Sequence, residues 1–193
     1  MSGVTAPIIV PANDDLAAGG ALAEGFEFVN GQMLELNASA KSSWVAGQIY
    51  RYLGDYCDAD PGWAFPPGTS FRCFTNNPRN IRRPDAAVIR LDRYTIEQCE
   101  REDHISVCPD VVVEVNAPTD LAMRVNRSVL DWLDAGAQLV WVIEPSLPTV
   151  YIHRRDGTLT VLRKSDTLTG DPVLPGFAVP VAELFQLPEP ART

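Results

Sequence analysis

A single glutamate, Glu114, interrupts the apolar run VVVEV at residues 111–115, and Asp85 opens the earlier apolar run DAAVIRL. A buried carboxylate is costly unless it is paired, hydrogen-bonded or bound to a metal ion, so Glu114 is either compensated or functional. Two carboxylates that converge repel each other unless a cation lies between them. Mg²⁺ often needs only one or two carboxylates plus water, and such a site activates water for attack on phosphate. If their strands are neighbours, Asp85 and Glu114 therefore predict a metal-dependent nuclease.

The strand that carries Glu114 is followed by a helix and a second apolar strand. Because strand side chains alternate, Glu114 and Asn116 share a face near the carboxyl end of their strand, where ligand sites of open α/β sheets lie. The pattern predicts a helix that is capped by Thr119 or Asp120 and ends at Gly136, before the apolar run QLVWVIEP. This order predicts a right-handed β-α-β crossover with a parallel pair of strands.

Hairpins and one more helix complete the predicted domain. The pairs Asn30–Gly31 and Asp156–Gly157 are typical two-residue hairpin turns. Residues 39–57 carry apolar side chains at helical spacing, with Ser39 or Ser42 as the cap. The fold class is therefore α/β, with a mixed β-sheet, flanking helices and hairpins at both ends. We expect a flexible N-terminal arm at residues 1–22 and a single domain at residues 23–193.

Composition excludes some classes of protein. The net charge of −9 and the sequence pI of about 4.6 argue against a nucleic-acid binder of the simple basic-patch type. Four cysteines without a C-x-x-C pair and only two histidines argue against structural zinc. The chain shows no signal-peptide pattern and no apolar stretch that approaches the length of a membrane span, so we expect a cytoplasmic protein without a membrane partner.

The order of these segments resembles the Uma-two family of restriction-endonuclease-like proteins in the PD-(D/E)XK nuclease superfamily. The resemblance is carried by FEFVNGQMLEL, RRPDAAVI, PDVVVEVNAPTD and WLDAGAQLVWVIEP. It implies a restriction-endonuclease-like fold and a metal-dependent DNA endonuclease that uses Mg²⁺ or Mn²⁺. It also implies that Asp85 and Glu114 are the metal ligands and that the protein forms a homodimer.

The chain departs from the family pattern where a lysine is expected. Asn116 occupies the commonest place of that lysine in the superfamily, and Ser128 occupies its usual place in this family. Serine cannot supply the mobile positive charge of lysine, although Arg124, one helical turn before Ser128, is a candidate substitute. Gln32 stands where the family often has an acid, and residues 41–43 stand where it often has a histidine.

Two functions therefore remain open from the sequence. The first is the endonuclease with Asp85, Glu114 and Arg124 in its catalytic site, and the second is an inactive relative that binds nucleic acid or a protein partner. At the level of single residues, Glu114 is interpreted either as a metal ligand or as the buried partner of an arginine from the set Arg82, Arg83 and Arg124. Asp110 is interpreted as surface at the strand edge, and Trp132 and Trp141 as core. Arg82 and Arg83 are interpreted as solvated turn residues, with phosphate contact as the alternative.

Overall fold

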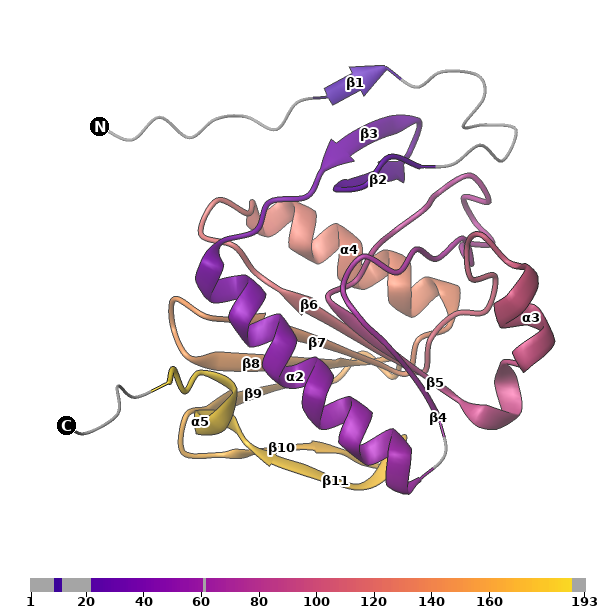
Figure 1. Cartoon of the computed structure of the whole chain (residues 1–193). Coiled ribbons are helices and arrows are strands. Elements are labelled where there is room, and N and C mark those ends of the chain that lie inside the picture. The colour runs from indigo at the N-terminus through magenta and orange to yellow at the C-terminus, as the bar shows by residue number, and fades with distance from the viewer. Residues whose placement is uncertain (1–8, 12–21, 61, 189–193) are drawn as a thin grey trace, which may run out of the picture.

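The computed structural model describes residues 9–11, 22–60 and 62–188 of the chain and has a six-stranded sheet at its centre (Figure 1). Strands β6 and β7 run parallel, whereas all other neighbours in this sheet are antiparallel. The predicted mixed sheet and the crossover from β6 through α4 to β7 are confirmed. The strands, in their order across the sheet, are β4 (Gly62–Phe65), β5 (Ala86–Arg90), β6 (Val111–Val115), β7 (Leu139–Glu144), β8 (Thr149–Arg154) and β9 (Leu159–Arg163).

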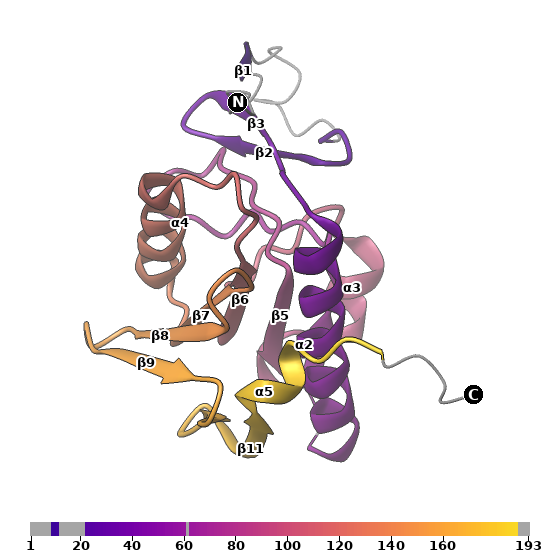
Figure 2. The ribbon, with the colours of Figure 1, turned by 90° about the vertical axis from the view of Figure 1, so that its left-hand side faces the viewer.

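Helices α2 (Ala40–Ala59) and α4 (Ala122–Ala135) cover opposite faces of the sheet (Figure 2). Each face of the sheet has its own apolar core, and the side chains of β6 point alternately into one and the other, as strand geometry requires. Val111, Val113 and Val115 pack on the side of α2, whereas Val112 packs with α4. Trp132 and Trp141 are fully buried, so their interpretation as core is confirmed. Glu114 therefore lies on the face that α4 covers.

The helix ends confirm most of the predicted caps. Ser39 is the N-cap of α2 and forms a capping box with Ser42. Gly136, at φ 120°, ends α4 as predicted. The predicted cap of α4 is wrong, because Leu121 occupies the N-cap without a side-chain hydrogen bond. The carboxylate of Asp120 instead accepts a hydrogen bond from the backbone N–H of Ala117 at 2.6 Å, which closes the preceding turn.

The two predicted hairpin turns are confirmed. Asn30 and Gly31 both have positive φ and join β2 (Phe26–Val29) to β3 (Gln32–Glu35), and a second turn joins β8 to β9. Strand β1 (Ile9–Pro11) pairs with β3, and the remainder of the predicted arm up to residue 21 lies outside the described residues. The other elements are η1 (Leu91–Arg93), α3 (Ile96–Arg101), β10 (Thr167–Gly170), β11 (Leu174–Pro180) and α5 (Val181–Leu184).

The expectation that Asp110 lies at the surface is wrong. Its side chain is fully buried, and Arg93 donates to Oδ1 at 2.7 Å. The backbone N–H of Arg90 donates to Oδ2 at 2.9 Å, and the Gln138 amide donates to Oδ1 at 3.0 Å. Asp110 thus joins the end of β5 to the segments that precede β6 and β7. These partners come from distant parts of the chain, so the strand pattern alone did not indicate them.

Candidate active site

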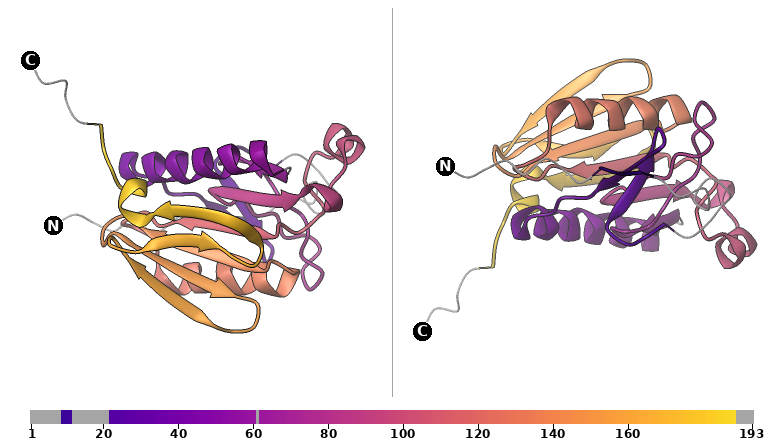
Figure 3. Two further views of the ribbon diagram at one scale, coloured as in Figure 1. Left: turned by 90° about the horizontal axis from the view of Figure 1, so that it is seen from below. Right: turned by 90° about the horizontal axis from the view of Figure 1, so that it is seen from above.

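A cavity of about 530 Å³ opens beside the start of β5, which Asp85 precedes, and the carboxyl end of β6, which carries Glu114. The hairpin β2–β3, the first turns of α4 and the start of α2 form its walls, and Figure 3 (right) shows the hairpin between the two helices. The predicted residues Asp85, Glu114 and Arg124 all line this cavity, as does Ser128. Tertiary structure thus brings together residues that lie far apart in the sequence.

Asp85 and Glu114 converge because their strands are neighbours. The antiparallel register pairs Ala86 with Val113, and the N–H of Asp85 donates to the carbonyl of Val113 at 2.9 Å. Continuing this register by one residue places Asp85 opposite Glu114, and opposed residues of an antiparallel pair share a face. The hypothesis of a two-carboxylate metal site requires that the two strands be adjacent. The structure meets this condition.

Each carboxylate is held through one oxygen. The backbone N–H of Val115 donates to Asp85 Oδ2 at 2.6 Å. Glu114 Oε1 accepts from Ser128 Oγ at 2.8 Å and from Trp132 Nε1 at 2.7 Å. Within the described residues, Asp85 Oδ1 and Glu114 Oε2 accept no hydrogen bond and form no ion pair. One oxygen of each side chain therefore remains available to a ligand in the cavity.

Burial shifts the ionisation of both acids in the same direction. Burial raises the pKa of Asp85 to about 7, and the nearby acid Asp120 adds to this shift. Burial also raises the pKa of Glu114 to about 8, with further contributions from the charges of Glu27 and Asp85. Both shifts come chiefly from burial, and a bound cation would offset them by stabilising the charged carboxylates.

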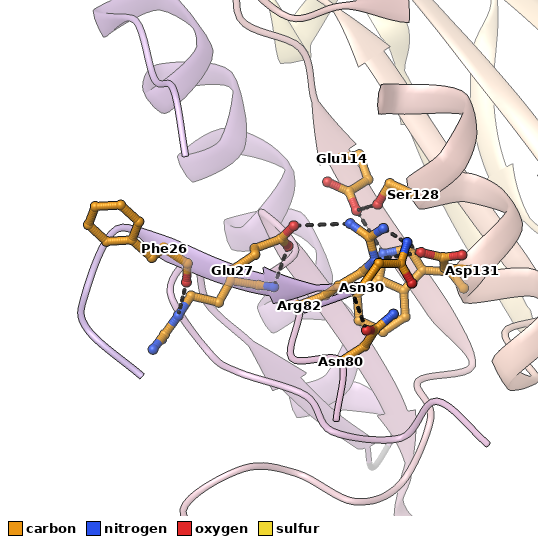
Figure 4. A network of polar contacts seen from close by, with 10 residues as sticks. Phe26, Glu27, Asn30, Asn80, Arg82, Glu114, Ser128 and Asp131 are labelled. Carbon is orange, nitrogen blue, oxygen red and sulfur yellow. Dashed lines mark hydrogen bonds and ion pairs between the residues drawn. The ribbon is translucent and has the colours of Figure 1, made fainter. Parts of the chain in front are cut away.

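A buried ion pair that the sequence interpretation missed lies next to this site (Figure 4). Arg82 Nη1 donates to Glu27 Oε2 at 3.0 Å, and the same guanidinium contacts Asp131 of α4 through Nε at 3.2 Å and through Nη2. Burial raises the pKa of Glu27, and the charge of Arg82 partly offsets this shift. A glutamate within the apolar run FEFV carries the same signal that singled out Glu114, so Glu27 was recognisable in the sequence.

The arginines before Asp85 are not solvated turn residues, and that interpretation is wrong. Arg82 is only 4 % exposed and is held by two carboxylates. Arg83 donates to the carbonyls of Phe26 at 3.1 Å and Leu22 at 3.2 Å, and also to that of Gly68. In the described part of the chain Glu114 forms no direct ion pair with Arg82, Arg83 or Arg124, so its interpretation as the partner of an arginine is limited to a charge interaction with Arg82.

The donor set fits a small oxygen-binding cation. Two uncommitted carboxylate oxygens on neighbouring strands, with room in the cavity for water, match the coordination of Mg²⁺, which retains several waters. Among the described residues there is no group of three or more His, Cys, Asp or Glu side chains placed to hold a metal ion. The arrangement therefore fits a two-carboxylate site rather than an all-protein cage.

The raised pKa values predict how the stability of the metal-free protein depends on pH. Because the pKa values of Asp85 and Glu114 are higher in the folded protein than in the unfolded chain, where they are about 4, protonation of these acids favours folding. This contribution to stability is complete below about pH 4 and is lost as pH rises through the folded pKa values, about 7 for Asp85 and about 8 for Glu114. We expect wild type to lose stability, on the order of a few kcal/mol, as pH rises over this range. The double variant Asp85→Asn/Glu114→Gln should not show this loss. Chemical denaturation across that pH range measures the difference. Parallel pH profiles for the two proteins would contradict it.

A solved structure shares the fold of this chain. The chain is similar to a crystal structure of "a putative nuclease belonging to DUF820" from Anabaena variabilis ATCC 29413, with a TM-score of 0.76 and 18% sequence identity. The similarity covers 89% of this chain and 96% of that chain, and at this identity it shows the fold alone.

The family follows from a second comparison. The model of the Uma2 family, described as "Putative restriction endonuclease", matches residues 22–182. The chain therefore belongs to the Uma2 family, and the resemblance noted in the sequence is confirmed. No curated protein matches the chain. In the described residues, no helix is both long and apolar enough to span a membrane.

Proposed function

We propose that this protein is a metal-dependent endonuclease that hydrolyses phosphodiester bonds of DNA, with Asp85 and Glu114 as the ligands of Mg²⁺ or Mn²⁺. One observation carries the proposal: the two acids lie on neighbouring strands, line one cavity, and each keep one oxygen without a partner within the described residues. Membership in the Uma2 family supports the same class of reaction.

The residues around the acids have distinct proposed roles. A bound divalent ion would supply a water of lowered pKa and would polarise the phosphate. The Val115 N–H orients Asp85, whereas Ser128 and Trp132 orient Glu114. Arg124 lies on the first turn of α4 and lines the cavity, so it is the proposed cation that stabilises negative charge on the phosphate.

The experiment that tests the proposal is a cleavage assay on two DNA substrates. Purified full-length protein is incubated with supercoiled plasmid and with circular single-stranded DNA, in Mg²⁺, in Mn²⁺ and in a chelator. We expect divalent-ion-dependent conversion of at least one substrate to shorter or linear products. Absence of cleavage of both substrates in both metals, by protein shown to be folded, contradicts the proposal.

A second candidate function is binding without cleavage, and the position of Ser128 favours it. A hydroxyl rather than an ammonium group lies against Glu114 at the place where the family usually has its lysine. Lys41 does not compensate, because it does not line the cavity and its Nζ donates to the carbonyl of Pro145 at 2.5 Å. The protein would then retain the cavity and its DNA contacts with little or no turnover.

Restoring a lysine separates these two candidates. In Ser128→Lys the ammonium group would lie beside Glu114, and we expect the cleavage rate to rise by about tenfold or more, as for an added electrostatic group at a reacting phosphate. Ser128→Met is the matched control, since it has similar length without the charge and should show no rise. Melting curves establish that both variants are folded. No increase in a folded Ser128→Lys would show that the missing lysine does not limit activity.

The homodimer and the cytoplasmic location expected from the sequence remain predictions. Light scattering of the purified chain coupled to size-exclusion chromatography measures the oligomeric state directly, and a monomer would contradict the expected dimer.

A further inference from the structure

The hairpin β2–β3 forms a fixed wall of the candidate active site. Phe28 and Ile81 exchange two backbone hydrogen bonds, at 2.9 and 2.7 Å. Leu22, Phe28, Met33 and Ile81 form a small core of their own beneath the hairpin. These contacts tie the hairpin to the segment that leads into Asp85.

Polar contacts strengthen the same attachment. Glu27 of the hairpin accepts from Arg82 and, at 2.7 Å, from the backbone N–H of Arg83. The Arg83 guanidinium also donates to the carbonyl of Phe26. Swinging the hairpin away from the cavity would leave buried charges and backbone groups without partners, which is costly. These contacts oppose any movement of the hairpin away from the cavity.

The cavity is large enough for a single nucleotide. At about 530 Å³ the cavity falls within the range of roughly 300–1,000 Å³ that holds one small molecule. Asp85 and Glu114 line it together with residues of the hairpin and α4, and both acids are only partly exposed. A phosphate within an intact duplex is rigidly flanked by its neighbours and by the second strand, whereas an unpaired strand can bend to bring one phosphate inside.

The cavity mouth carries both kinds of contact that a single strand needs. Arg124 and Arg127 line the cavity on one side of α4, and within the described part of the chain neither side chain forms a hydrogen bond or an ion pair. Both are therefore available to phosphates on either side of the bond to be cleaved. The apolar side chains Leu34, Leu36 and Met123 line the same cavity and offer surface to an unstacked base.

A bound metal ion would make the charge of the cavity more favourable for a polyanion. Five carboxylates and four arginines line it, which leaves one net negative charge when all are ionised. A bound divalent cation reverses that sign. The net charge of −9 over the whole chain gives no support to long, unspecific contact with a duplex.

We infer that the cavity takes an unpaired strand of DNA, one nucleotide at a time, and that the fixed hairpin excludes intact B-form duplex from the two acids. The inference rests on the proposed nuclease function and specifies the substrate class of that site. The cleaved bond lies in single-stranded DNA, at a strand end, or in an unpaired stretch within a duplex.

Binding to matched oligonucleotides tests this inference. Fluorescence anisotropy is measured with a labelled single strand and with the duplex of the same sequence, in Ca²⁺ at one fixed salt concentration. We expect the single strand to bind about tenfold more tightly or better. In Mg²⁺ or Mn²⁺, a duplex that contains a central unpaired stretch is expected to be cleaved within that stretch.

A pair of charge variants links the binding to the cavity mouth. Met123 is 77 % exposed and lines the cavity, so Met123→Glu places a carboxylate beside the incoming phosphates with little effect on folding. We expect it to weaken single-strand binding about tenfold. Leu147→Glu is the matched control, because Leu147 is 68 % exposed and is not part of the cavity, and its binding should be unchanged.

The outcomes distinguish this inference from the function on which it rests. Tighter binding and cleavage of fully paired duplex would overturn the inference and leave the nuclease proposal intact. Equal loss of binding in Met123→Glu and Leu147→Glu would also overturn it. Single-strand binding that depends on Met123, without cleavage in any metal, would support the inference about the cavity and contradict the proposed catalysis.

Discussion

Replacing Glu114 by glutamine is expected to reduce metal-dependent DNA cleavage by about a thousandfold or more, and Asp85→Asn to have a similar effect. Each change keeps the size of the side chain and removes the negative charge that would hold the ion. The remaining oxygen of each acid is the one that no described residue binds. Initial rates on the best substrate, at saturating Mg²⁺ and Mn²⁺, measure the loss.

Metal titration separates lost ligation from lost folding. Calorimetry should show heat of Mn²⁺ binding for wild type and little for either variant. Glu97→Gln is the matched control, because Glu97 lies on the exposed helix α3 and, among the described residues, forms an ion pair only with Arg101 at the surface. The control should keep both cleavage and Mn²⁺ binding. Undiminished Mn²⁺ heat in Glu114→Gln would rule out Glu114 as a ligand.

The largest change in stability is expected from Arg82→Met. This substitution keeps most of the side-chain volume but removes the charge that lies between Glu27 and Asp131, whose side chains are 8% and 15% exposed. One buried and one partly exposed carboxylate are then left without their cation. We expect the free energy of unfolding to fall by about 3–5 kcal/mol, which corresponds to a melting temperature lower by roughly 10 °C for a chain of this size.

Combining substitutions tests the physical reason for this loss. Adding Glu27→Gln and Asp131→Asn to Arg82→Met removes the orphaned charges, so a substantial part of the lost stability should return. Arg155→Met is the matched control, because the Arg155 side chain is exposed and forms no ion pair among the described residues. Its stability should change by less than about 0.5 kcal/mol. A similar loss in Arg82→Met and Arg155→Met would contradict the role assigned to the buried pair.

The local patterns of the sequence were sufficient for most elements of the central sheet, for helices α2 and α4, and for two of the site residues. Apolar alternation and Asn30–Gly31 predicted the strands and the hairpin, because strand periodicity and turn chemistry depend on neighbouring residues alone. Glu114 stood out because a charge within an apolar strand is costly wherever that strand is buried. The same reasoning extended to Glu27 would have found another acid that lines the cavity.

Contacts between distant segments were decided by tertiary structure. Arg82 looked like a solvated turn residue because its partners, Glu27 and Asp131, lie 55 and 49 residues away in the chain. Asp110 looked like strand-edge surface for the same reason, since its partners reach it from other segments. Ion pairs and hydrogen bonds depend on distance in space, and local sequence patterns do not report that distance.

The sequence by itself determined the family, the mixed α/β sheet and the two acids that open the question of metal binding. Only the tertiary structure decided that Asp85 and Glu114 share one cavity, that Ser128 holds Glu114, and that a fixed hairpin stands over both. The physical reason is that periodicity and turn chemistry are properties of adjacent residues. A cavity is a property of surfaces that meet only after the chain has folded.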